Sequence, residues 1–186
     1  MIGRKVVLIL GAGCSADIGY PTGVKLRKHI LEKLESNTAI LSHLKRIHPD
    51  QKIDEFKKRL KRRGITTIDN FLQNLPSLHN VGRSVIAAIL MHYENEEKLM
   101  ESKLYAKIYE DLDTGKFEEF GWDNLVIITF NYDRSLEHYL FTALQESYEG
   151  KSDEECATQV KKIPIIHLHG HLGLLPWQGT NSRPYQ

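Results

Sequence analysis

Three short stretches of this 186-residue chain carry side chains that could do chemistry together. The first, Gly11 to Ser15 (GAGCS), has closely spaced glycines that let backbone N–H groups approach a pyrophosphate. Asn131 and Asp133 supply an amide and a carboxylate, which can hold a hydroxyl group, a water molecule or a carboxamide. His169 can act as a general base near neutral pH. These residue types suit a ligand that contains a pyrophosphate and a ribose.

Each stretch follows an apolar run that is typical of a buried parallel strand. The three runs are Lys5 to Leu10, Asn124 to Phe130 and Lys162 to His167. Helical periodicity lies between them, over Val24 to Leu34, Asp50 to Arg63, Ile68 to Leu72, Val81 to Met100, Leu104 to Leu112 and Ser135 to Leu144. Strands joined by long helical crossovers pair in parallel, and such sheets bind ligands at the strands' carboxyl ends.

The sequence therefore predicts an α/β fold with a Rossmann-like parallel sheet flanked by helices, and a helical insertion between the first two strands. Thr66 or Thr67 is expected to cap the helix that starts at Ile68. The polar, acidic segment from Gln145 to Val160 is interpreted as a loop. The helix from Asp50 to Arg63 is dominated by charge, and we interpret it as a solvated helix that covers the core through Ile53, Phe56 and Leu60.

Each stretch also allows a purely structural interpretation. The glycine turn can connect a strand to a helix without binding anything, and Asp133 can cap a helix that begins near Ser135. His167, His169 and His171 could hold a metal ion, although no nearby carboxylate or cysteine completes the set. A hydride-transferring Rossmann enzyme is disfavoured, because the expected second strand with its terminal acidic residue is replaced by the helical segment KHILEKLES.

The composition favours one cytoplasmic domain. The chain is 41% hydrophobic, and its 25 Lys and Arg against 24 Asp and Glu give a net charge of +1, so we expect no direct contact with nucleic acid or membrane. The only cysteines, Cys14 and Cys156, are too few for a four-cysteine zinc site or a disulfide scaffold. The apolar run Val6 to Leu10 is far shorter than the roughly 20 residues that span a bilayer.

In this order the three stretches resemble the sirtuin family of NAD-dependent enzymes. That family has a G-A-G-x-S turn followed by G-[IY]-P, then T-[QF]-N-x-D, then a catalytic His-Gly pair; the chain has GAGCS with GYP, TFNYD and HLHG. The resemblance assigns the NAD phosphates and ribose to four residues of the turn, Gly11, Ala12, Gly13 and Ser15. It assigns the nicotinamide ribose and carboxamide to Asn131 and Asp133, and the role of base to His169.

Two departures from the family narrow the prediction. Protein-deacylating sirtuins carry a four-cysteine zinc module and a Phe-Arg pair after the first proline, whereas Thr22, Gly23 and Val24 follow Pro21 here. The chain is more similar to the zinc-free sirtuin-like domains of prokaryotic antiphage systems, which hydrolyse NAD, and the segment Ile68 to Leu72 fits that branch. Only 17 residues follow His169, whereas the family has further strands there, so we expect the chain to be the N-terminal part of a longer protein.

The resulting hypothesis is an NAD hydrolase of antiphage defence that releases nicotinamide and ADP-ribose. Asn131 and His169 would be catalytic, NAD would be the substrate, and no zinc would be bound. A second copy, or a fused or associated sensor domain, is the expected partner. Two alternatives stay open: a module that senses NAD or ADP-ribose without cleaving it, and a deacylase or ADP-ribosyltransferase that acts on a macromolecule.

Overall fold

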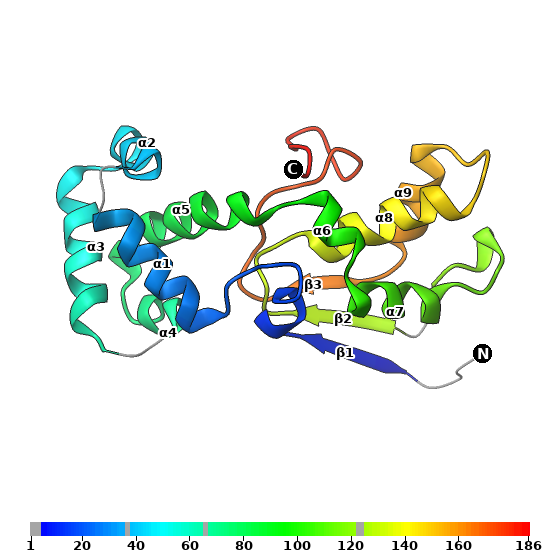
Figure 1. Cartoon of the computed structure of the whole chain (residues 1–186), viewed down its shortest axis with the longest axis horizontal. Helices are drawn as coiled ribbons and strands as arrows, with labels where there is room; N and C mark the ends of the chain where they lie inside the picture. The colour runs from blue at the N-terminus through cyan, green and yellow to red at the C-terminus, as the bar shows by residue number, and fades with distance from the viewer. Residues whose placement is uncertain (1–4, 36–37, 65–66, 122–124) are drawn as a thin grey trace. The chain divides into compact units, whose positions relative to one another are not determined.

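The computed structural model describes residues 5–35, 38–64, 67–121 and 125–186, and the chain divides into two compact units. Unit 1 comprises Met1–Gly19 and Glu94–Gln186, and unit 2 comprises Tyr20–Tyr93. Unit 2 lies within the helical insertion that the sequence predicts between its first two strands. The two units are described separately below, and Figure 1 labels their elements.

Unit 1 is built on a three-stranded parallel sheet. Its strands are β1 (Val6–Leu10), β2 (Leu125–Thr129) and β3 (Ile165–His167), in the order β1-β2-β3. Leu10 pairs with Thr129, and Thr129 pairs with His167, so the carboxyl ends of all three strands meet at one edge. The predicted α/β class and parallel pairing are confirmed. The strands are shorter than predicted, and Asn124 lies outside the described residues.

The helices of unit 1 are α6 (Glu96–Met100), α7 (Lys103–Leu112), α8 (Ser135–Ser147) and α9 (Asp153–Lys161). Helices α7, α8 and α9 lie on one side of the sheet (Figure 1). On β1, Val7 and Ile9 stay 57% and 64% exposed, whereas Leu10 is buried. The prediction that β1 is buried on both faces is therefore wrong, because the described helices of unit 1 cover one face.

Helix α9 corrects the interpretation of Gln145 to Val160 as a loop. Ser152 accepts a hydrogen bond from the backbone of Glu155, whose side chain accepts one from the backbone of Ser152, and this capping box starts the helix. Cys156 and Val160 are buried on its inner face. The acidic first turn that suggested a loop suits a helix N-terminus, where negative charge is favourable.

Unit 2 is helical. It contains α1 (Gly23–Glu35), α2 (Ala39–Ile47), α3 (Asp50–Arg62), α4 (Ile68–Leu72) and α5 (His79–Leu90), with 3-10 turns at Pro76–Leu78 and Met91–Tyr93. The rings of Phe56 and Phe71 meet edge to face in its core, with centroids 5.4 Å apart. Thr67 caps α4 as predicted, and Thr66 lies outside the described residues.

Among the described residues, no helix has both the length and the apolar character needed to cross a membrane.

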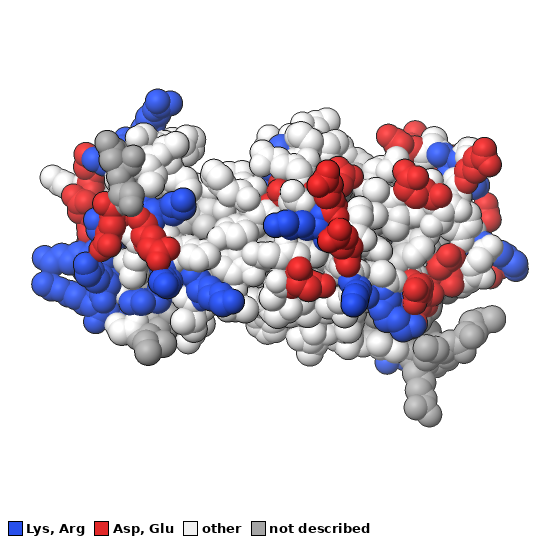
Figure 2. All heavy atoms as spheres, in the orientation of Figure 1, with Lys and Arg blue, Asp and Glu red and all other residues white. Residues whose placement is uncertain are grey.

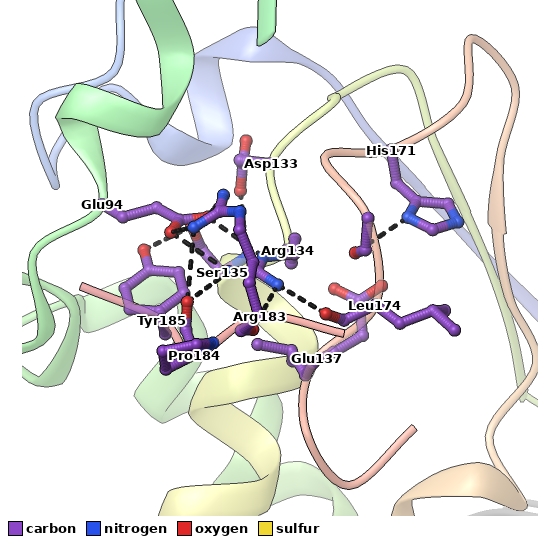
Figure 3. A network of polar contacts seen from close by, with 12 residues as sticks. Glu94, Asp133, Arg134, Ser135, Glu137, His171, Leu174, Arg183, Pro184 and Tyr185 are labelled. Atoms are coloured by element: carbon purple, nitrogen blue, oxygen red, sulfur yellow. Dashed lines mark hydrogen bonds and ion pairs between the residues drawn. The ribbon is translucent and has the colours of Figure 1, made fainter. Parts of the chain in front are cut away.

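The predicted helix from Val81 to Met100 is interrupted, and the carboxylate of a residue in the break contacts a buried arginine. Helix α5 ends at Leu90 and α6 begins at Glu96, which leaves Glu94 between them. The Glu94 carboxylate accepts two hydrogen bonds from Arg134, at 3.0 and 3.1 Å, and two from Arg183, at 2.6 and 2.7 Å (Figure 3). This cluster of three side chains is the Glu94 network.

The Glu94 network fixes the C-terminal segment of the chain to the start of α8. Arg134 also donates hydrogen bonds to three backbone carbonyls, those of Leu174, Arg183 and Pro184. Its side chain is 1% exposed, and that of Glu94 is fully buried. A buried arginine needs both a counter-charge and filled hydrogen bonds, and here it has both.

Replacing Glu94 by glutamine should destabilise the protein strongly. Glu94→Gln leaves the buried Arg134 guanidinium without a counter-charge, and we expect the free energy of unfolding in urea to fall by about 3–5 kcal/mol. The matched control is Glu96→Gln, because Glu96 is 53% exposed and contacts only His138 among the ion pairs of the described residues. A surface pair of this kind is worth about 0–1 kcal/mol. Equal effects of the two substitutions would contradict the role of the Glu94 network.

Candidate active site at the strand ends

The glycine turn after β1 leads into a short 3-10 helix, Ala12–Ser15. The first α-helix, α1, begins at Gly23, close to the start of the helix predicted over Val24 to Leu34. The backbone N–H groups of Cys14 and Ala16 are used within the turn, in bonds to the carbonyls of Gly11 and Gly13. A Cβ atom built at Gly11 or Gly13 would meet no atom within 4 Å. A ligand can therefore approach this backbone closely.

Ser15 connects the end of β1 to the end of β2. Its hydroxyl group donates to the Asp133 carboxylate at 2.9 Å and accepts from the Asn131 amide at 3.0 Å. The Tyr105 hydroxyl lies 3.0 Å away, and it must be the donor because the single Ser15 proton is already used. The Ser15 hydroxyl thus makes all three of its hydrogen bonds inside the protein, and the residue is 1% exposed.

Asp133 is a buried carboxylate that lies two residues before the start of α8. One oxygen accepts from Ser15, and the other accepts from the backbone N–H of Ser135 at 3.2 Å. Burial raises the pKa of Asp133 above its ordinary value, although the hydrogen bonds from Ser135 and Ser15 oppose the shift. The structural alternative is met only in part, because the N-cap residue of α8 is Arg134, while Asp133 accepts from the first residue of the helix. Direct contact of Ser15 and Asp133 with a substrate stays a prediction, and these bonds do not favour it.

Asn131 lies at the carboxyl end of β2 and is 8% exposed. Its side-chain NH₂ group donates one N–H to Ser15. Among the described residues the second N–H and the carbonyl oxygen have no hydrogen-bond partner, so they can serve a ligand. Its backbone N–H donates to the Thr129 hydroxyl at 3.0 Å. Hydrogen bonds of both the side chain and the backbone therefore fix the position of Asn131.

His169 lies in the turn that follows β3 and is exposed. Its ring packs against Phe130, with centroids 5.7 Å apart, and against Tyr132, with centroids 6.0 Å apart. These two aromatic residues directly precede and follow Asn131 in the chain. The structure thus places His169 beside the Asn131 segment, as the predicted parallel pairing of β2 and β3 requires.

His167 has a different environment from His169. The strand ends at His167, whose Nδ1 donates to the Asn131 carbonyl at 2.9 Å and whose Nε2 lies 2.6 Å from a Glu137 oxygen. The side chains of His167 and Glu137 are 8% and 9% exposed. Burial by itself lowers the pKa of His167, but the hydrogen bond and negative charge of Glu137 outweigh it, so the pKa lies above its ordinary value.

The rings of His167 and His171 lie close together, with centroids 5.4 Å apart, but their nitrogen atoms have different partners. Nδ1 of His171 lies 3.0 Å from the Gly173 carbonyl, whereas His167 is bonded to Asn131 and Glu137. Within residues 5–35, 38–64, 67–121 and 125–186, no three His, Cys, Asp or Glu side chains are grouped so as to hold a metal ion.

Sequence reasoning missed two side chains that complete the cluster, Tyr105 and Glu137. Tyr105 comes from α7, 90 positions from Ser15, and no pattern links them. It is 1% exposed, and burial raises its pKa well above the ordinary range, so the phenol stays protonated. Glu137 could have been predicted from the sequence. It lies in the first turn of α8, the helix that follows the end of β2 (Figure 3).

Comparison of the chain with protein-family models, with curated proteins and with solved structures found no match. The function is therefore argued from the geometry of the strand ends and from the motifs they carry.

The pairing of His167 with Glu137 predicts a pH-dependent contribution to stability. Since the folded pKa of His167 is raised, the pair stabilises the fold fully below the unfolded value of about 6.5 and loses this effect as the pH rises through the folded pKa. The titration of the His167 ring can be followed by NMR. Glu137→Gln should lower its midpoint, whereas Glu146→Gln, an exposed change on the same helix, should not. A midpoint that ignores Glu137→Gln would contradict the pairing.

Proposed function

We propose that this chain cleaves NAD at the bond between nicotinamide and ribose. The products are nicotinamide and ADP-ribose, with water as the acceptor. The observation that carries the proposal is the meeting of three motifs at one sheet edge: the amide of Asn131 is bonded to Ser15 of the glycine turn, and the ring of His169 packs on the residues that flank Asn131. Ligands of open parallel sheets bind at such an edge.

The pyrophosphate of NAD is assigned to the glycine turn. The open space at Gly11 and Gly13 supports this assignment, because a phosphate oxygen must come close to the backbone to accept from N–H groups. The ribose next to nicotinamide would then lie toward Asn131, whose free amide N–H and oxygen can bind a hydroxyl group and a water molecule.

The reaction breaks the C1′–N bond of NAD and forms a bond between C1′ and a water oxygen. Electrons of the broken bond go to nicotinamide, which leaves as a neutral molecule, and the water proton passes to His169 and then to solvent. Because the transition state resembles an oxocarbenium ion, positioning and electrostatic stabilisation provide most of the acceleration. Asn131 would orient the water or the ribose. Asp133, with both oxygens bonded internally, would keep Ser15 and Asn131 in place.

The similarity of the motifs to zinc-free sirtuin-like domains extends this proposal to antiphage defence.

One alternative has an observation in its favour. The hydroxyl of Ser15 and both oxygens of Asp133 are occupied within the protein, which suits a module that binds NAD or ADP-ribose without cleaving it.

Asn131 and His169 should act as one unit in NAD cleavage. We expect Asn131→Ala and His169→Ala each to reduce nicotinamide release by about 10²–10⁴-fold, as loss of general acid-base catalysis does, and the double variant to be little worse. Circular dichroism should report an unchanged fold. His171→Ala is the control, because His171 is also exposed and on the same loop. Wild-type turnover in either folded variant would refute the assignment, and NAD binding without turnover in the wild type would favour the sensor.

Gly13→Ala tests the place of the pyrophosphate without disturbing the fold. Apart from the residues next to Gly13 in the chain, no atom of the described residues lies within 4 Å of the added methyl group, so the melting temperature should stay close to that of the wild type. A pyrophosphate against this backbone would collide with the methyl group, and we expect NAD affinity, measured by calorimetry, to fall at least about tenfold, or about 1.4 kcal/mol. Unchanged affinity in the alanine variant would place the pyrophosphate elsewhere.

A further inference from the structure

The net charge of +1 hides a strong separation of charge between the two units. Unit 2, residues 20–93, contains 14 Lys and Arg against 6 Asp and Glu, a net charge of +8. The rest of the chain contains 11 against 18, a net charge of −7. The expectation that the chain has no attraction for polyanions rested on the total. It does not apply to unit 2 alone, because fields act locally and are screened within about 10 Å.

The positive charge of unit 2 is concentrated on α3. Positions 57 to 63 contain six basic residues, Lys57, Lys58, Arg59, Lys61, Arg62 and Arg63, and the sequence has no Asp or Glu from Phe56 to Ile68. Figure 2 shows Lys and Arg side chains gathered over this helix. We call these six residues the α3 basic surface.

The side chains of the α3 basic surface repel one another, and the contact of α3 with the core does not depend on them. Like charges four residues apart face one another on a helix and destabilise it, and three such pairs occur here: Lys57 with Lys61, Lys58 with Arg62, and Arg59 with Arg63. The core contact of α3 is made by apolar residues, since Ile53, Phe56 and Leu60 are at most 2% exposed. Cations in the last turn do suit the helix dipole, but that effect is confined to one turn.

Three of the six residues have partners within the protein. Arg59 pairs with Glu55, Lys61 pairs with Glu35, and Lys57 donates a hydrogen bond to the Leu34 carbonyl. Lys58, Arg62 and Arg63 are exposed and form no ion pair within the part of the chain that the structure describes. Lys58 and Arg62 stand one helical turn apart, so their charges are presented together to the same side.

We propose that the α3 basic surface binds the phosphate backbone of nucleic acid. A dense row of Lys and Arg with no acidic residue among them matches a row of phosphates, and such contacts need no particular base sequence. A lipid surface is disfavoured, because a helix that lies on a membrane inserts its apolar face, and that face of α3 is buried in the core. An acidic protein partner is disfavoured as well, since stable protein interfaces centre on apolar or aromatic anchors, and positions 57 to 63 offer only the buried Leu60. The proposal does not depend on NAD cleavage.

The test measures binding of the full chain to labelled oligonucleotides by fluorescence anisotropy over a range of salt concentrations. Duplex DNA, single-stranded DNA and RNA are separate arms, since all share the phosphate backbone. In the variant Lys58→Gln, Arg62→Gln, Arg63→Gln, we expect affinity at low salt to fall at least about tenfold and the slope of log K against log salt to lose about three, close to one for each phosphate contact removed.

A matched variant removes the same charge from unit 1. Lys5→Gln, Lys103→Gln, Lys161→Gln changes three exposed lysines outside unit 2 and should leave affinity and slope close to those of the wild type. Thermal melting of the first variant should not fall, because like-charge repulsion is removed; if it does fall, Arg62→Gln alone should still reduce the slope by about one. No binding by the wild type at low salt would overturn the proposal. Equal loss in both triple variants, or tighter binding to phosphatidylserine vesicles or polyglutamate than to nucleic acid, would overturn it too.

Discussion

A single buried hydroxyl group, that of Ser15, holds the ends of β1 and β2 together. It donates to Asp133 and accepts from Asn131 and Tyr105, so every hydrogen bond it can make is filled. Because unsatisfied polar groups in the interior are costly, each of these four side chains depends on the others for its position. The parallel sheet brings the strand ends near one another, and this cluster fixes how they meet.

A second buried cluster begins one residue later. Arg134 follows Asp133 in the chain but belongs to the Glu94 network, which attaches the C-terminal segment through three backbone carbonyls. The two residues therefore connect the candidate site to the packing of unit 1. His167 adds a third restraint, since it holds the Asn131 carbonyl while Glu137 holds His167. Hydrogen bonding from the β3 side thus restrains the backbone of Asn131, whereas His169 is exposed.

The features predicted correctly from sequence are those with local causes. Apolar runs and their spacing identified the three strands, the parallel order followed from the long helical connections, and α3 was found from Ile53, Phe56 and Leu60. Helix α9 was missed because its acidic first turn looked like a loop, although the Ser152–Glu155 capping box was readable. Tyr105 and the Glu94 network could not be predicted, since their partners lie 40 to 90 positions away and no periodicity connects them. The net charge of the whole chain is uninformative for a different reason: it averages two units of opposite sign.

If the three strand ends form one site for NAD, as we propose, the chemical shifts of the backbone amides will report it. An NMR titration of the isotope-labelled protein with NAD should shift the amide signals of Gly11, Gly13, Asn131 and Gly170 together, with one common dissociation constant, because one ligand would cover all of them. The amides of α3 should not follow that curve. No shifts at millimolar NAD, or shifts confined to residues away from the three strand ends, would rule out an NAD site at these ends.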